Sequence, residues 1–254
     1  MKEEFEGEIY FTPKQAAKHF NLNISTIKNY IYANKLRTLR TPGGHHRIRK
    51  SELLVTLGDP PAKEGNNNLP LMHNLCLSIL AVFKTIGPVG DSLIIHSKNV
   101  SALAKAIAKA MDLKGSDVKR IEMAALIHDI GHIAIDKSVL LKSGMFTREE
   151  RELIKEHPAA GERMLASVKE LKDIKGIIIH HHEWVNGKGY PHGLKGEEIN
   201  IASRIIAIAE AYDSMVSPQS YKKPVSKETA ISELMRCRDI QFDGTIVEVF
   251  TKII

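Results

Sequence analysis

Apolar residues recur at helical spacing through most of the chain after residue 70. The clearest examples are two stripes, one of His96, Val100, Leu103 and Ile107 and one of Val118, Ile121, Ala125 and His128. Residues three or four positions apart lie on the same face of an α-helix, so each stripe predicts a helix with one inward face. Few segments alternate between apolar and polar residues as strands do. This part of the chain is therefore predicted to be almost wholly α-helical.

The first fifty residues show a different pattern, with two short helices close together. Thr12 can cap a helix from Pro13 to Phe20, because its side-chain oxygen accepts from free N–H groups and proline suits the first helical position. After the turn NLN, a second helix is expected from about Ser25 to Asn34, with Ile27 and Ile31 facing inward. This spacing predicts a helix-turn-helix.

A hairpin is expected directly after these helices. The segment LRTLRTPGGHHRIR, residues 36–49, has a strand, a Pro-Gly-Gly turn and a second strand. Arg40, His45, His46 and Arg47 cluster around the turn. The hairpin therefore has the form of a basic wing beside the two helices.

The segment Gly58 to Pro70, GDPPAKEGNNNLP, combines Pro, Gly and Asn with little apolar content and is predicted to be a linker. It divides the 254 residues into a winged helix-turn-helix domain at 1–57, a linker at 58–70 and an all-helical domain at 71–254. The fold class expected is mainly α, with a small winged helix-turn-helix domain followed by an all-helical domain.

Charge is concentrated in the first domain. Nine Lys or Arg residues and no Asp or Glu lie between Tyr10 and Lys50, whereas the whole chain carries a formal net charge of only +6. A basic stretch with helix-turn-helix spacing and a wing favours DNA as the partner. The alternatives are a solvated surface or a module that docks on another protein.

Histidines gather in the second domain, where eight of the twelve lie between His96 and His192. Three expected helices offer His96, His128 with Asp129, and Glu210 with Asp213, and the segments at His157 and at His181 and His182 add imidazoles. Taken singly, each is explained as a hydrogen-bonded core residue. Together they match the ligands of borderline divalent metals and are too many for one tetrahedral ion. Two ions that share a carboxylate are the simplest arrangement.

The first domain resembles the DNA-binding domain of MerR-type regulators and phage excisionases, through FTPKQAAKHFNLNISTIKNYI and KLRTLRTPGGHHRIRKSEL. This resemblance implies that the second helix enters the major groove with Thr26, Lys28 and Asn29 near base edges. It also implies that the wing, with Arg40, His45, His46 and Arg47, contacts DNA, with Arg40 and Arg47 on phosphates. His46 stands where the family usually has arginine, which weakens one phosphate contact.

The second domain resembles the HD-GYP family of metal-dependent phosphohydrolases from about Leu71 onward. The motifs are HSKNV, AALIHDIGH, LLKSGMFTREE, HPAAGERML, HHEWVNGKGYPHGLKG, SRIIAIAEAYDSM and QFDG. The resemblance implies cleavage of the cyclic dinucleotide c-di-GMP. It implies one metal held by His96, His128, Asp129 and Glu210, and a second held by His157, His181 and His182, with Asp129 bridging the two. The family implies iron or manganese, while the ligand types alone also allow zinc or nickel.

The same resemblance assigns catalysis to Asp129 and His132, and contacts with the substrate to His132, Lys142, Tyr190, Tyr221 and Lys222. Several positions depart from the family pattern. His132 replaces a phosphate-binding lysine and is shorter and less charged. Glu210 replaces a ligand aspartate, Asn186 replaces the aspartate of DGxGYP, and the segment Gln219 to Lys222 lacks a phosphate-gripping arginine. Ser92 stands where some relatives carry a glutamate for a third metal, so two metals at most are expected.

Two readings of function remain open. In one, the second domain is a working phosphodiesterase tethered to DNA. In the other, it has lost most turnover and acts as a cyclic dinucleotide sensor or dimerisation module that controls DNA binding. A third possibility is a metal that only holds the helices together. A homodimer is expected because helix-turn-helix proteins commonly bind two half-sites.

The location expected is the cytoplasm, without a membrane partner. No stretch approaches the roughly 20 uncharged apolar residues that span a bilayer, and the start MKEEFEGEIYF is too acidic for a signal peptide. The two cysteines, Cys76 and Cys237, have no paired-ligand spacing and are expected to be inert core residues.

Overall fold

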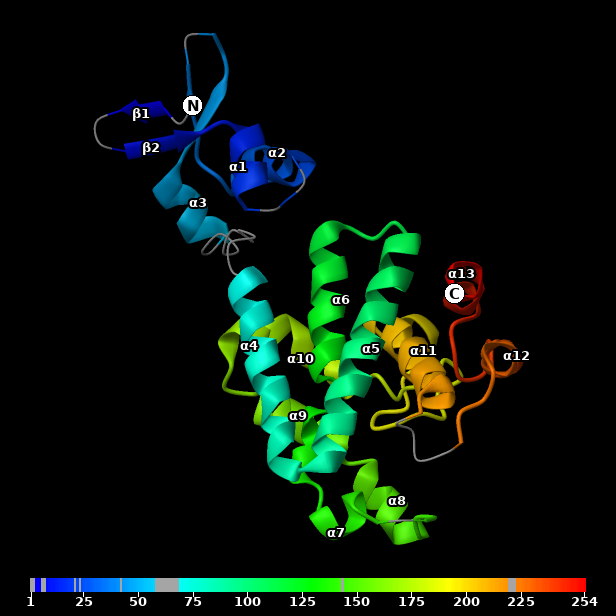
Figure 1. Ribbon diagram of the computed structural model, residues 1–254. Coiled ribbons are helices and arrows are strands. Elements are labelled where there is room, and N and C mark those ends of the chain that lie inside the picture. Colours follow the sequence, from blue (N-terminus) through cyan, green and yellow to red (C-terminus); the bar gives the residue numbers. More distant parts are fainter. Residues whose placement is uncertain are drawn as a thin grey trace. The chain divides into compact units, whose positions relative to one another are not determined.

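The chain divides into two units, Met1–Asn66 and Asn67–Ile254, each with its own internal packing (Figure 1). The computed structural model describes residues 3–5, 8–20, 22, 24–41, 43–57, 69–142, 144–218 and 223–254. The two units are described separately. The predicted domains and linker fall close to this division, although most residues of the predicted linker lie outside the described ones.

The N-terminal unit combines a small antiparallel sheet with three helices. Its elements are β1 (Glu3–Phe5), β2 (Glu8–Phe11), α1 (Pro13–His19), α2 (Ile24–Tyr32), β3 (Leu39–Arg40), β4 (His46–Arg49) and α3 (Lys50–Leu57). The strand order is β1-β2-β4-β3. The hairpin of β3 and β4 pairs Leu39 with Arg47 and Arg40 with His46, and it forms the predicted wing. The additional pairing of β2 with β4 anchors the wing to the start of the unit.

Local signals place the two helices of the predicted helix-turn-helix. Thr12 Oγ1 accepts from the Gln15 N–H at 3.2 Å while Gln15 Oε1 accepts from the Thr12 N–H at 2.7 Å, so both ends of a capping box are present. Ile27 and Ile31 of α2 are buried, as their spacing predicts, against Phe11 and other apolar residues of the unit. Full burial of one such side chain stabilises the fold by about 1.5–3 kcal/mol.

The regular secondary structure in the described part of the second unit is helical apart from two isolated β-bridges. Its helices are α4 (Leu69–Ala81), η2 (Val82–Ile86), α5 (Pro88–Ala110), α6 (Gly115–Ile127), η3 (Ile130–Ala134), α7 (Lys137–Leu140), α8 (Arg148–Ile154), α9 (His157–Met164), η4 (Lys169–Leu171), α10 (Lys172–Ile179), η5 (Gly196–Glu198), α11 (Ile201–Val216), α12 (Lys227–Arg236) and α13 (Gly244–Ile253). The mainly α fold class predicted from the spacing of apolar residues is confirmed.

Three helices form the centre of this unit. The long helix α5 packs against both α6 and α11 (Figure 1). Val100 and Ile107 of α5 and Ile121 of α6 are buried in the shared core, which confirms the inward stripes read from the sequence. Because polar residues on these stripes must also face inward, the packing places His96 and His128 beside α11. Cys76 lies in the same core, and burial raises the pKa of its thiol to about 12, as expected for an inert residue.

The start of the second unit differs from expectation in two ways. Leu69 and Pro70 belong to α4 and not to the predicted linker, because proline is tolerated in the first turn of a helix. In addition, the stretch Leu69–Ile86 has a mean hydropathy of 1.5 over 18 residues and is 22% buried. By length and composition alone, this stretch could cross a membrane. The prediction of no membrane partner did not take this stretch into account. Cys76, Leu80 and Phe83 of this stretch pack into the core.

Candidate functional site

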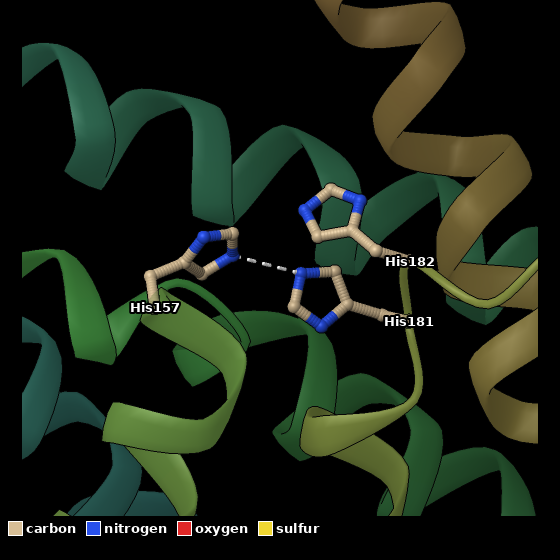
Figure 2. Close-up of side chains that lie close together, drawn as sticks. All are labelled: His157, His181 and His182. Carbon is tan, nitrogen blue, oxygen red and sulfur yellow. Dashed lines mark hydrogen bonds between the residues drawn. The ribbon is translucent and has the colours of Figure 1, made fainter. Parts of the chain in front are cut away.

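All seven predicted metal ligands lie in one cluster inside the second unit. α5 carries His96, the end of α6 carries His128 and Asp129, and α9 begins with His157. His181 and His182 follow α10, and Glu210 lies on α11. Figure 2 shows His157, His181 and His182 with their rings turned toward one another, and the Nε2 atoms of His157 and His181 are 3.2 Å apart. Residues more than a hundred positions apart in sequence thus meet at one centre.

Backbone carbonyls orient three of the imidazoles. Nδ1 of His128 lies 2.8 Å from the carbonyl oxygen of Ala125, and Nδ1 of His157 lies 2.8 Å from that of Ile154. His181 Nδ1 pairs with the Ile178 carbonyl in the same way. A carbonyl can only accept, so each Nδ1 carries the hydrogen and each Nε2 presents a lone pair to the centre. Histidines that bind metals are held in this manner.

His96 is oriented by a carboxylate in place of a carbonyl. Its Nδ1 lies 2.6 Å from Asp213 Oδ2, and the Asn99 amide donates to Asp213 Oδ1 at 2.9 Å. Asp213 is therefore a positioning residue that sequence reasoning noted beside Glu210 without assigning it a role. The signal that could have found it is the spacing of three residues, which puts both acids on one face of α11. Asn99 carried no such signal.

Asp129 faces two groups of imidazoles with its two oxygens. Oδ2 lies 3.3 Å from His128 Nε2 and 3.8 Å from His96 Nε2. Oδ1 lies 3.3 Å from His157 Nε2, 3.5 Å from His132 Nε2 and 4.0 Å from His181 Nε2. One carboxylate between two sets of nitrogen ligands has the arrangement that bridges a pair of metal ions.

The protonation states suit metal binding. Burial lowers the pKa of His128 to about 4 and also lowers the pKa of His157 and His181, so these imidazoles are neutral at pH 7, the form that can bind a metal. Burial raises the pKa of Glu210 to about 8, and the charge of Asp129 acts in the same direction. Although burial alone would raise the pKa of Asp129, the imidazoles around it, His128 first, hold it well below its usual range.

Unpaired polar atoms and ligand spacing fit a cation at this centre. His128 Nε2 is buried without a hydrogen-bond partner among the described residues, which is costly unless something else binds it. Four sets of three ligand atoms lie within 4.8 Å of one another, and each set comes from the predicted ligands and His132: His157 with His181 and His182, His96 with His128 and Asp129, His128 with His181 and Glu210, and Asp129 with His132 and His157. Neutral imidazoles with two acids suit iron, manganese, zinc or nickel.

Two glycines allow the cluster to close. A Cβ on Gly131 would lie 1.8 Å from the His157 carbonyl oxygen, so only glycine lets η3 approach the start of α9. A Cβ on Gly189 would lie 2.5 Å from the His182 carbonyl oxygen. This approach brings Tyr190 over the centre, where its ring stacks on His182 with the centroids 4.8 Å apart.

A cavity of about 520 Å³ is lined by five of the predicted metal ligands, namely His96, Asp129, His157, His182 and Glu210. Apolar residues such as Leu93, Leu140 and Phe146 line one part of it, and His132, Lys142 and Tyr190 line it as well. Lys142 Nζ forms an ion pair with Glu150 at 2.6 Å, so its charge is partly engaged. Tyr221 and Lys222, the other predicted substrate contacts, lie outside the described residues.

The predicted DNA-contacting residues occupy one unit and are accessible. Lys28, Asn29, Arg40 and His45 are exposed, and Thr26, His46 and Arg47 are half-buried. His46 Nδ1 lies 2.7 Å from Thr38 Oγ1, so part of its ring is used within the wing. A hollow of about 600 Å³ between the end of α2 and the wing is lined by Arg37, Arg40 and His46. Sequence reasoning did not select Arg37, although it lies within the same basic segment.

The model of the HD domain matches residues 86–246, which contain every ligand of the cluster. The chain belongs to the HD domain family. A model of the helix-turn-helix domain matches residues 10–55. Both predicted resemblances, the HD-type domain and the helix-turn-helix, are therefore confirmed.

The HD domain is similar to several curated enzymes. It is 38% identical over 160 residues to a cyclic di-GMP phosphodiesterase of Thermotoga maritima, which covers 62% of this chain and 44% of that protein. It is 36% identical over 157 residues to the cyclic di-GMP phosphodiesterase response regulator RpfG of Xanthomonas campestris pv. campestris, which covers 61% of this chain and 42% of that protein. The chain thus spans less than half the length of these relatives.

Solved structures show the same HD fold. Bd1817, an HDG"Y"P protein from Bdellovibrio bacteriovorus, superposes with a TM-score of 0.56 at 21% identity, covering 74% of this chain and 62% of that chain. The HD domain of the L. monocytogenes phosphodiesterase PgpH superposes with a TM-score of 0.52 at 16% identity, covering 69% of this chain and 94% of that chain. At these identities the likeness concerns the fold alone.

Three departures of this HD domain from the family pattern have clear structural outcomes. Asn186 Oδ1 accepts from the Lys188 N–H at 2.9 Å, a role that an aspartate oxygen fills equally well. The Ser92 hydroxyl donates to the Pro88 carbonyl at 3.3 Å. His132 points toward Asp129 and stacks on His157, with centroids 4.2 Å apart.

Proposed function

We propose that this protein is a DNA-binding transcription regulator whose HD domain binds and hydrolyses c-di-GMP at a dinuclear metal centre. The observation that carries the proposal is the position of Asp129, whose two oxygens face two separate sets of imidazoles beside a cavity of about 520 Å³. The names of the curated relatives supply the substrate class.

The ligands divide between two ions. His96, His128 and Glu210 would hold one, His157, His181 and His182 would hold the other, and Asp129 would contribute one oxygen to each. Iron or manganese is the expected metal. When bound, the two ions would lower the pKa of a shared water and offset the negative charge of the phosphate under attack. Asp129 is thus assigned the central catalytic role, because it would hold both ions.

The cavity residues bind and orient the substrate in this proposal. Tyr190 and Phe146 would supply aromatic contacts to a guanine base, and Lys142 and His132 would contact the phosphate, because all four line the cavity. Hydrolysis adds one water across a phosphodiester bond: the water oxygen joins phosphorus, the bond from phosphorus to the 3′ oxygen breaks, and that oxygen takes up a proton. The product is the linear dinucleotide. Tyr221 and Lys222 remain proposed contacts from sequence.

A second candidate function is a sensor that binds the cyclic dinucleotide without turning it over. Two observations favour it. Lys142 is already paired with Glu150, and His132 is turned toward Asp129 where the family carries a lysine for the phosphate. Both features leave less positive charge for the substrate, whereas binding of a base in the apolar part of the cavity is unaffected.

The deciding experiment uses the full chain with manganese or iron restored under anaerobic conditions. Metal per chain is measured, and c-di-GMP is then incubated with the protein while linear product is followed by chromatography. Two metals per chain with product support the phosphodiesterase; dinucleotide binding without product supports the sensor. Asp129→Asn is the control, because it keeps the shape of the side chain but removes the bridging charge.

The N-terminal unit would bring this chemistry to DNA. Lys28, Asn29 and Thr26 are assigned to base edges, and Arg40, Arg47, His45 and His46 to the wing contacts, because these side chains are wholly or partly accessible on one unit. The protein would act as a homodimer in the cytoplasm, with one helix-turn-helix for each half-site. Sedimentation of the protein with and without DNA tests this assembly.

A further inference from the structure

His132 occupies a ligand-like position that no metal role has been given. It lies on η3, three residues after Asp129, and its Nε2 is 3.5 Å from Asp129 Oδ1. His157 Nε2 is 3.3 Å from the same oxygen, and His181 Nε2 is 4.0 Å from it. The ligand atoms of Asp129, His132 and His157 all lie within 4.8 Å of one another. His132 therefore presents its Nε2 to the same Asp129 oxygen as two of the assigned ligands.

These separations are those of ligands around one ion. With metal–ligand bonds of about 2.1 Å, neighbouring ligand atoms are roughly 3.0–3.4 Å apart and opposite ones about 4.2 Å apart. The three nitrogen–oxygen distances around Asp129 Oδ1, from 3.3 to 4.0 Å, fall in this range.

Hydrogen bonds among the described residues do not satisfy both ring nitrogens of His132. Its Nδ1 is buried without a hydrogen-bond partner in the part of the chain that the structure describes. The side chain is 14% exposed, so it is neither a solvated surface group nor a satisfied core residue. Nε2 lies beside the Asp129 oxygen that also faces His157 and His181, so an ion at this point would bind the Nε2 lone pair while Nδ1 carries the hydrogen.

We propose that His132 is an additional ligand of the metal ion held by His157 and His181. This inference rests on the proposed metal centre. It changes the role expected at this position, because a lysine ammonium has no lone pair for a metal, whereas an imidazole has one. The replacement thus removes a phosphate-binding charge and adds a metal–nitrogen bond. One coordination position fewer remains open to phosphate oxygens or water at that ion.

The test titrates Co²⁺ into the metal-free full chain and records the number of ions bound, their affinities and the visible absorption spectrum. His132→Ala and His132→Lys both remove the proposed nitrogen. In each, one of the two Co²⁺ ions is expected to bind at least about tenfold more weakly, with altered absorption. Added imidazole is expected to restore the spectrum of the alanine variant, which a merely structural role would not produce.

His192→Ala is the matched control. His192 is exposed and its ring pairs with His180, 2.9 Å away, outside the cluster. Its Co²⁺ affinities and spectrum are expected to equal those of the wild type. Thermal unfolding of the metal-free variants checks that each is folded, and the lysine variant serves if the alanine variant is not.

The outcomes separate this inference from the proposed function. Wild-type affinity and spectrum in both His132 variants would overturn the role of His132 and leave the dinuclear centre intact. A wild-type chain that takes up no Co²⁺ would instead overturn the metal centre itself and the inference with it. Loss confined to the His132 variants supports both.

Discussion

At the scale of single residues, the site depends on how each imidazole is anchored. Carbonyl oxygens of Ala125 and Ile154 hold His128 and His157 through Nδ1 at 2.8 Å, and Asp213 holds His96 at 2.6 Å. Anchored rings lose little rotational freedom when a metal binds, so affinity depends on residues that never touch the metal. Asp213 is the anchor most open to test, because it is a side chain.

Asp213→Asn is expected to weaken metal binding by about 10–100-fold. The amide keeps the size of the side chain but removes the negative charge that orients the His96 imidazole and raises its basicity as a ligand. Affinity is measured by competition with a chelator of known strength. Asn99→Ala, which removes only the amide that supports Asp213, is expected to have a smaller effect. Equal affinity in wild type and Asp213→Asn would contradict the anchoring role.

The metal-free protein is expected to lose stability as pH rises from about 7 to 9. The folded-state pKa of Glu210 is raised to about 8, so the folded protein binds this proton more tightly than the unfolded chain does, and the benefit disappears as pH passes 8. His96 acts in the same direction. Burial would lower its pKa, but Asp213 and nearby acids raise it to about 9. Each group changes the free energy of unfolding by at most about 1.4 kcal/mol per pH unit.

Thermal unfolding in the presence of chelator, recorded from about pH 4 to 9.5, measures this loss. Glu210→Gln is expected to flatten the decline, because the amide stays neutral throughout. The opposite trend is expected at low pH. Burial lowers the folded-state pKa of His128 to about 4, so the unfolded chain binds this proton more tightly than the folded protein does. Stability is therefore lost as pH falls from the ordinary histidine pKa toward 4. A melting temperature that rises from pH 7 to 9 would refute the assignment.

At the scale of elements, the site forms where helices end. His128 and Asp129 follow α6, His157 starts α9, and His181 and His182 follow α10. Helix ends approach closely only where no side chain intervenes. Gly131 meets this condition, because a Cβ there would lie 1.8 Å from the His157 carbonyl oxygen. The approach of η3 to α9 thus decides whether Asp129 reaches His157.

Gly131→Ala is expected to weaken metal binding and to lower the free energy of unfolding by several kcal/mol, as overpacking against backbone does. Gly176→Ala is the control, because Gly176 lies within α10 and its Cβ would meet nothing within 4 Å. That control is expected to stabilise the protein by about 0.5–1 kcal/mol, since alanine favours helix. Denaturant unfolding with and without metal measures both changes.

The wing of the N-terminal unit is the element assigned to phosphate contacts. Arg40→Ala is expected to weaken binding to a mixed-sequence DNA duplex and to reduce the slope of log affinity against log salt by about 1. Lys84→Ala, which removes an exposed charge from the second unit, is the control and is expected to change neither value. An affinity that does not depend on salt would indicate a protein partner for the basic segment in place of DNA.

At the scale of the whole molecule, the chain joins a helix-turn-helix match at 10–55 to an HD match at 86–246. A ligand can alter the activity of a distant domain only if it binds two states of the protein with different affinities. The fusion of the two domains motivates such coupling here.

Saturating c-di-GMP is expected to change the affinity of the full chain for its DNA by about 5–150-fold, the usual range of coupling between two sites. A duplex selected by the protein from a random library serves as the DNA, and fluorescence anisotropy reports binding with and without the dinucleotide. Asp129→Asn, which prevents assembly of the dinuclear centre, is expected to remove the difference. Identical affinities in the wild type would show that the two domains act independently.

Local sequence patterns sufficed for the elements and for the chemical types at the site. The spacing of Val118, Ile121 and Ala125 predicted α6, because a helix face is a property of neighbouring residues. The clustered histidines and acids predicted donor types that suit a metal, and the resemblance to the HD-GYP family implied the ligand role of Asp129. The linker prediction extended two residues too far, to Pro70, because proline marks both loops and helix starts.

Only the tertiary structure decided how these groups meet. The two directions of the Asp129 carboxylate, the anchoring of His96 by Asp213, the pairing of Lys142 with Glu150 and the turn of His132 toward the centre all depend on residues from other helices. Side-chain rotamers and imidazole tautomers follow from the partners that packing supplies, and most of those partners are distant in sequence. The sequence by itself therefore determined which candidate ligands exist, and the packing of α5, α6, α9 and α11 determined which of their atoms face the same point.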